Sequence, residues 1–240
     1  MKLQIYLYKG NMKKLFLIIF FITIVSLNAF AVDNDSINHD IDIQKRIDSI
    51  GFNILNSNKI NKPVVFRYRF ENSTKFKKSG AKAHKITIYD NDYMHAENDD
   101  EIAGFLAMKI SAAVKSYDNS AIPVVNSLQS RIMPKKYEIF YDKQAVDFMV
   151  NAGYNPLGLI TFITKTCPQK NSDFISRHNL TSKRLAIIYE RIFTQYPYFL
   201  TNNVYIRNDY YQNFLLNSIE NRKLLEDKLK YNYHYEIHYE

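Results

Sequence analysis

The chain has 240 residues, of which 46% are hydrophobic and 15% aromatic, a composition that excludes a disordered chain and a membrane protein with many spans. Its formal charge of +8 falls to +4 without residues 1–31, which hold four lysines and no acids, and this small, scattered excess argues against nucleic acid as a partner. A single cysteine, Cys167, excludes an internal disulfide.

The N-terminus has the pattern of an export signal. The basic pair Lys13–Lys14 precedes an apolar run over 15–27, and Ala29-Phe30-Ala31 has the small-x-small pattern of a cleavage site. We therefore expect residues 1–31 to be a signal peptide, with Met12 as an alternative start. An uncleaved anchor is the alternative, although the apolar run is shorter than the roughly 20 residues of a spanning helix. The expected location is periplasmic or secreted, off the membrane after cleavage.

Periodicity and turn residues predict an α+β fold that is mainly helical, with a small sheet. The predicted helices cover 41–55, 99–116, 137–151, 157–165, 181–196 and 209–230; the strands cover 64–70 and 85–89; and a loop covers 71–83. We expect a mobile leader over 32–40, one domain over 41–200, and a C-terminal helix and tail over 201–240 packed on it.

The helix predicted over 99–116 is amphipathic. Asn98 and Asp99 are its candidate caps, with acids in the first turn where they complement the helix dipole. One face carries Ile102, Leu106, Ile110, Ala113 and Tyr117, and another carries Phe105, Met108 and Ala112. Met108 and Ala112 are thus one turn apart, the spacing at which a zinc peptidase places its two histidines.

Three further motifs surround this helix in the sequence. Asp100–Ala103 precedes the metal-binding position, Glu138–Asp142 has the form E-x-x-x-D before the turn Ala152–Pro156, and His178-Asn179 precedes Arg184. In this order and spacing they resemble metallopeptidase family 48, the group of the HtpX and CAAX prenyl proteases. The resemblance spans about 41–197.

This resemblance implies a zincin-like (gluzincin) metallopeptidase scaffold. In the family the residue matched by Glu138 is the third zinc ligand, and the residue matched by Asp142 supports a histidine ligand. The counterpart of His178 stabilises the oxyanion, and the counterpart of Arg184 follows that histidine by six residues.

The positions that should read His, Glu and His instead read Met108, Lys109 and Ala112. A thioether suits Cu(I), a methyl group binds nothing, and an ammonium group repels a cation. We therefore expect no zinc and no intact catalytic residue. We expect Lys109 to pair with Glu138, with Asp142 as a second partner, because a buried carboxylate without a partner is costly.

The expected function is that of an exported pseudopeptidase that binds a polypeptide or another envelope protein, with strand 85–89 as a candidate edge for main-chain pairing. The alternatives are an active zinc endopeptidase rebuilt from Glu138, His178 and either His84 or His95, and a structural envelope protein. Simpler roles also stay open: Lys109 as a solvated residue, Met108 and Ala112 as packing residues, Glu138 and Asp142 as a polar helix face, and His178 as a residue at a helix start.

The C-terminal run 231–240 alternates tyrosines with histidines and glutamates. In a strand, His234, Glu236, His238 and Glu240 would share one side and could hold a metal. An edge strand or a frayed tail is the simpler expectation.

Overall fold

The computed structural model describes residues 39–70, 79–82, 84–118, 134–167, 169 and 178–239. The predicted signal peptide and most of the predicted leader lie outside these residues. Gln44–Glu240 form one compact unit, and 39–43 belong to a second unit, Met1–Ile43.

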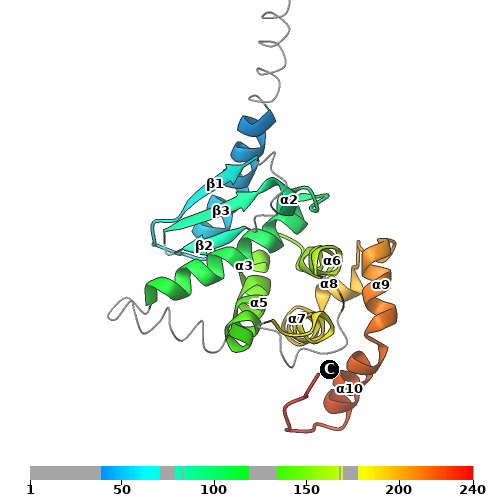
Figure 1. Cartoon of the computed structure of the whole chain (residues 1–240). Helices are drawn as coiled ribbons and strands as arrows, with labels where there is room; N and C mark the ends of the chain where they lie inside the picture. The colour runs from blue at the N-terminus through cyan, green and yellow to red at the C-terminus, as the bar shows by residue number, and fades with distance from the viewer. Residues whose placement is uncertain are drawn as a thin grey trace, which may run out of the picture. The chain divides into compact units, whose positions relative to one another are not determined.

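The prediction of a mainly helical α+β fold with a small sheet is confirmed (Figure 1). A first helix covers residues 39–57. The other elements are β1 (Val65–Arg69), β2 (Gly80–Lys82), β3 (Lys85–Tyr89), α2 (Asp90–Tyr93), α3 (Asp99–Asp118), α5 (Pro134–Asn151), α6 (Leu157–Thr166), α7 (Thr181–Gln195), α8 (Tyr198–Thr201), α9 (Asp209–Asn217) and α10 (Ile219–Lys230).

The sheet has the strand order β1-β3-β2, with β1 parallel and β2 antiparallel to β3. The prediction that strand 85–89 forms an edge is therefore wrong, because β3 is the central strand. The loop predicted over 71–83 is also wrong at Gly80–Lys82, which forms β2. Three residues are too few to display an alternating pattern, so the sequence gives no sign of this strand.

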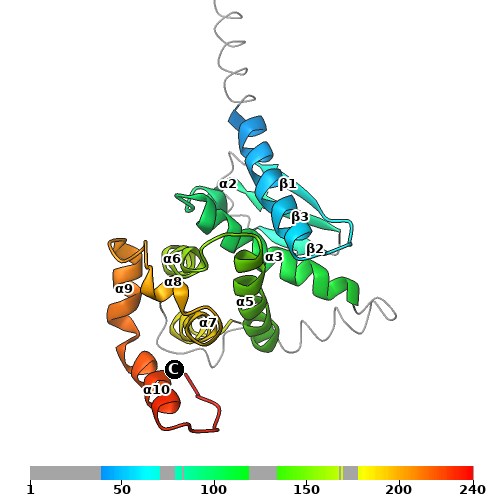
Figure 2. The same cartoon turned by 180° about the vertical axis from the view of Figure 1, so that it is seen from behind.

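One face of the sheet is apolar and is covered by residues 44–57 of the first helix (Figure 2). The strands turn four buried side chains to this face: Phe66, Tyr68, Ile86 and Ile88. Gly51 permits the close approach of the helix, since a Cβ there would lie 2.5 Å from the ring of Phe66.

Helix α3 is the centre of the core. The sheet lies on one side of it, and α5, α6 and α7 lie on the other (Figure 1). The predicted apolar face is buried at Ile102, Leu106, Ile110 and Ala113. The predicted cap is confirmed at Asn98, whose Oδ1 accepts from Glu101 N at 3.0 Å, while the Glu101 carboxylate accepts from Glu97 N at 2.8 Å. The pair resembles a capping box, but the Glu101 carboxylate binds the N–H of the residue before the cap instead of the N–H of Asn98.

Two details of the predicted helices are wrong. Neither Thr181 nor Ser182 caps α7, because the N-cap is Leu180 and makes no side-chain capping bond. The single helix predicted over 209–230 is broken at Ser218 into α9 and α10, which pack against α6 and α7 respectively. Among the helices that the structure describes, none combines the length and apolar character needed to cross a bilayer.

Of the two expectations for the C-terminal run, the strand is wrong over 231–239. These residues are irregular after a turn in which Asn232 has a φ of +52°. Ile237 and Tyr239 are buried, whereas three neighbouring tyrosine rings are exposed and in contact with one another: Tyr231, Tyr233 and Tyr235.

Candidate functional site

The residues of the separate sequence motifs converge where α3, α5 and α7 meet. Met108 comes from α3, Glu138 and Asp142 come from α5, and Arg184 comes from α7. Arg184 contacts all three of the others, so the site is a cluster around one guanidinium group.

Arg184 and Asp142 form a buried bidentate ion pair. Arg184 Nε donates to Asp142 Oδ2 and Nη2 donates to Oδ1, each at 2.7 Å, and the Asp142 side chain is 1% exposed. Burial by itself lowers the pKa of Arg184, but the Asp142 and Glu138 carboxylates outweigh it and raise that pKa. Burial raises the pKa of Asp142, and the Arg184 charge opposes this. The guanidinium is therefore a fixed positive charge within the helical core.

Glu138 uses both of its carboxylate oxygens within the protein. Oε1 lies 3.0 Å from His178 Nδ1 and 3.3 Å from Arg184 Nη1. Oε2 accepts from Asn179 N at 2.8 Å and from Asn179 Nδ2 at 3.0 Å. Asn179 Nδ2 also donates to Lys135 O at 2.8 Å, which ties the segment before α7 to the first turn of α5. The structure thus brings Glu138 and His178 together, with His178 on the exposed side of the contact.

Two sulfur atoms complete the surroundings of the guanidinium. Arg184 Nη2 donates to Met108 Sδ at 3.4 Å, and Nη1 lies 3.6 Å from Cys167 Sγ. Cys167 is the C-cap of α6, and no motif in the sequence marks it as part of the site. Ala112 is half-buried one turn beyond Met108 on α3.

Lys109 lies beside this cluster and reaches towards the sheet. Its Nζ donates to Ser79 O at 3.2 Å and lies 5.3 Å from the centre of the Phe105 ring. Like the Arg184 charge, its charge opposes the rise that burial causes in the pKa of Asp142. Arg184 makes the contacts with Glu138 and Asp142 that the sequence predicted for Lys109.

The donor set does not fit a zinc ion. Where the resemblance expects two histidine ligands, Met108 offers a thioether and Ala112 a methyl group, which leaves Glu138 alone, and both of its oxygens already accept hydrogen bonds. Within the described ranges, no group of three or more His, Cys, Asp or Glu side chains is arranged to hold a metal ion. Neither His84 nor His95 therefore joins Glu138 and His178 in such a group.

A second buried network lies at the start of α3. The Glu101 carboxylate is fully buried and accepts from Lys165 Nζ at 2.9 Å and from Thr161 Oγ1 at 2.8 Å. Next to it, Asp100 accepts from Tyr205 OH and Asn155 N, each at 2.9 Å. The sequence marked these two acids as lead-in residues and as first-turn acids that complement the helix dipole. The structure also uses them to join α3 to α6 and to the segment before α9.

The fold and the site together define a mainly helical α+β protein with an arginine–carboxylate cluster between three core helices. A comparison with models of known families finds no match, and a comparison with curated proteins finds no match either.

Proposed function

We propose that this chain is a pseudopeptidase, a metallopeptidase-like protein of the family 48 type that has lost its zinc site and binds polypeptide. One observation carries the proposal. The residues that the resemblance selects from motifs at 108, 138–142, 178 and 184 contact one another around a single guanidinium. An unrelated helical protein would have no reason to bring together residues chosen in this way.

The cluster also accounts for stability without a metal. A scaffold that loses a cation from its core must neutralise the carboxylates left behind, because an unpaired buried charge costs several kcal/mol. Arg184 does this for Asp142 and Glu138. Arginine suits the task, since its planar group matches the two oxygens of a carboxylate and stays charged when buried.

The sheet edge beside α3 supports the polypeptide-binding part of the proposal. β2 is an edge strand that packs on α3, and Lys109 holds it there through the Ser79 carbonyl. An extended segment could add to β2 through main-chain hydrogen bonds, which need no catalytic group. The partner would be a polypeptide or an envelope protein met after export to the periplasm or the medium.

The metal content of the purified mature chain, residues 32–240, tests this proposal. We expect no stoichiometric zinc and no chelator-sensitive cleavage of labelled casein, but measurable binding of casein by fluorescence anisotropy. A full equivalent of zinc together with chelator-sensitive cleavage would overturn the proposal in favour of a zinc endopeptidase with a rearranged site. Absence of both zinc and casein binding would favour a structural protein.

A further inference from the structure

The outer edge of β1 is closed by a side chain instead of a strand. In a parallel pair, alternate residues turn their main-chain groups to the neighbouring strand and the residues between them turn theirs outward. Val65 N donates to His84 O at 2.9 Å, so Phe66 and Tyr68 present their groups at the outer edge. There Gln44 Oε1 accepts from Tyr68 N at 2.7 Å, and Gln44 Nε2 donates to Phe66 O at 3.2 Å.

The Gln44 amide copies what an added strand would supply. A peptide unit offers one N–H and one carbonyl oxygen, and a glutamine side chain offers the same pair. The Gln44 amide nitrogen also donates to Asp48 Oδ1 at 3.0 Å, one turn along the first helix, which holds the amide in place. Gln44 is only half-buried, so rotation of one side chain would open the edge.

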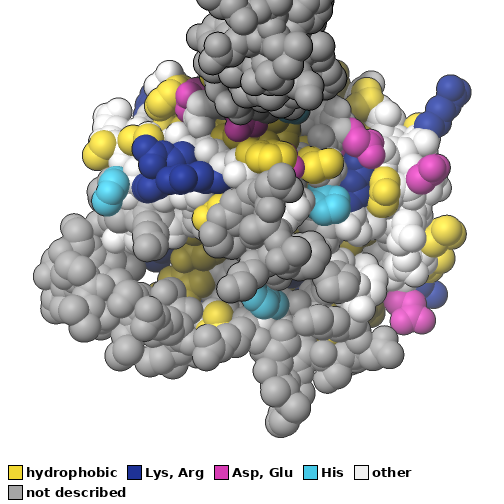
Figure 3. Space-filling view, turned by 45° about the horizontal axis from the view of Figure 1, so that its top comes forward, with side chains coloured by type: hydrophobic (Ala, Val, Ile, Leu, Met, Phe, Trp, Pro, Cys, Tyr) yellow, Lys and Arg dark blue, Asp and Glu magenta, His cyan; other side chains and the backbone are white. Residues whose placement is uncertain are grey.

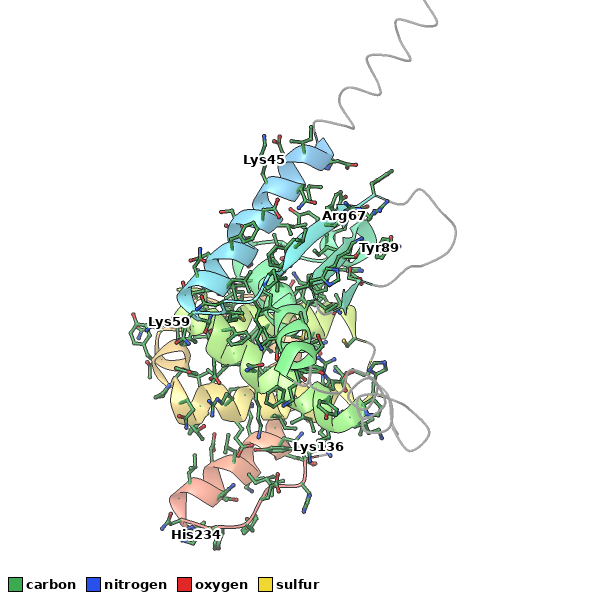
Figure 4. All side chains as sticks on the ribbon, turned by 90° about the vertical axis from the view of Figure 1, so that its left-hand side faces the viewer. Lys45, Lys59, Arg67, Tyr89, Lys136 and His234 are labelled. Atoms are coloured by element: carbon green, nitrogen blue, oxygen red, sulfur yellow. The ribbon has the colours of Figure 1, made fainter. Side chains whose placement is uncertain are left out.

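The solvent-facing side of this strand is positively charged. Arg67 and Arg69 are exposed, and within the part of the chain that the structure describes neither guanidinium forms an ion pair. Their register partners on β3 are Thr87 and Tyr89, which bring no negative charge. Figure 4 shows Arg67 and Tyr89 on the side of the sheet turned away from the first helix. Figure 3, which brings the sheet end of the molecule forward, shows Lys and Arg side chains gathered on the left of that face.

We propose that the outer edge of β1 is a docking site for an extended polypeptide with acidic side chains at alternate positions, and that Gln44 closes it until such a segment replaces its amide. Main-chain hydrogen bonds would supply affinity, and acids opposite Arg67 and Arg69 would supply selectivity. A second copy of the chain fits less well, because antiparallel pairing of two β1 strands would bring arginines together. β2 lies on the other edge of the sheet, so this inference does not depend on the pseudopeptidase proposal.

Fluorescence anisotropy with the labelled peptide Thr-Glu-Val-Glu-Val-Glu-Thr tests the site on the mature chain. We expect Gln44→Ala to bind the peptide roughly tenfold more tightly than the unmodified protein, since the competing amide is gone. Gln195→Ala is the matched control, because Gln195 is exposed at the end of α7, and it should bind like the unmodified protein. Equal affinity in Gln44→Ala and the control would overturn the proposal.

Three further measurements separate strand addition from its alternatives. A peptide with proline in place of both valines should lose affinity, since proline donates no hydrogen bond. Unchanged affinity would mean adsorption by charge alone and would overturn the proposal. The double substitution Arg67→Glu with Arg69→Glu, in a chain that keeps Gln44, should make the protein prefer the same peptide with lysine in place of each glutamate. If the double variant still prefers the glutamate peptide, the proposal is overturned. This test does not depend on whether Gln44→Ala folds. Dimerisation of Gln44→Ala on size-exclusion chromatography would assign the edge to a second copy and contradict the acidic partner.

Discussion

The guanidinium of Arg184 neutralises the Asp142 and Glu138 carboxylates in the helical core, a position in which Lys109 would be less suitable. Lysine offers a point charge, whereas guanidinium presents parallel N–H donors at the spacing of a carboxylate, and both of its bonds to Asp142 are 2.7 Å long. Lys109 follows Met108 by one residue and so leaves α3 in a different direction, towards Ser79. The pairing was not evident from sequence because Arg184 and Asp142 are 42 residues apart and meet only when α5 packs on α7.

Removing Arg184 should destabilise the fold severely. In Arg184→Ala the Asp142 carboxylate is left buried without its partner, and we expect the free energy of unfolding to fall by about 3–5 kcal/mol in urea titration. Arg191→Ala on the same helix is the control, since Arg191 forms a bidentate pair with Asp147 that is partly exposed. Its loss should cost about 0–1 kcal/mol. If the two variants lose the same free energy of unfolding, burial does not make the Arg184–Asp142 pair more important for stability than the partly exposed pair.

Restoring the missing ligands tests the alignment of α3 with the peptidase motif. Met108→His with Lys109→Glu and Ala112→His places two imidazoles one turn apart on α3. If Glu138 stands where the third ligand belongs, the triple variant should bind one zinc ion by isothermal titration. Ala112→His alone is the control and should not bind zinc, because one added imidazole cannot complete the site. If the triple variant binds no zinc, Glu138 does not stand where a third ligand belongs.

At the scale of elements, the contact between α3 and α6 depends on a glycine. A Cβ on Gly158 would lie 2.7 Å from Asp100 Cβ and 2.8 Å from its carbonyl carbon, which cannot move aside without shifting α3. Gly158→Ala should therefore lower the free energy of unfolding by roughly 1–3 kcal/mol. Gly80→Ala, where the added methyl meets nothing, should stay within about 0.5 kcal/mol of the unmodified chain. A thermal unfolding series compares the two, and matching melting temperatures would contradict the close packing.

The elements that the sequence predicted are those whose pattern is long. α3 and α7 carry several turns of apolar periodicity, and the strand at 85–89 alternates over five residues. β2 has only three residues and no such pattern, and it forms a strand because its main chain pairs with β3. The C-terminal run has the alternation of a strand but remains irregular, since alternation alone supplies no neighbouring strand with which to pair. Local pattern therefore predicts helices well here, and sheet membership depends on distant partners.

At the scale of the whole molecule, the sequence motifs predicted which residues lie together in the candidate site. The hydrogen bonds and ion pairs between these residues depend on how the helices pack. The sequence named Glu138, Asp142, His178 and Arg184 as candidates, and they meet. It did not predict that Asn179 would bind Glu138 or that Cys167 would adjoin Arg184, because these contacts depend on how α6 ends and how α7 begins. The C-terminal segment follows the same rule. Tyr205 donates to Asp100 of α3, and α9, which carries the buried Tyr211, packs against α6, and neither contact has a local signature in the sequence.

These buried phenols should make the molecule sensitive to alkali. Burial raises the pKa of Tyr211 to about 12, and it raises the pKa of Tyr205 and Tyr239 as well. Above pH 10 the unfolded chain loses the Tyr211 proton while the folded chain keeps it, so the unfolded state is favoured increasingly until pH 12. We expect Tyr211 to account for a loss of about 2–3 kcal/mol across this interval. The Tyr211→Phe variant has no phenol to ionise at this position. Its free energy of unfolding, measured by urea titration from pH 9 to 12, should therefore fall less steeply than that of the unmodified chain. Parallel curves for the two proteins would show that the Tyr211 hydroxyl is not buried in solution.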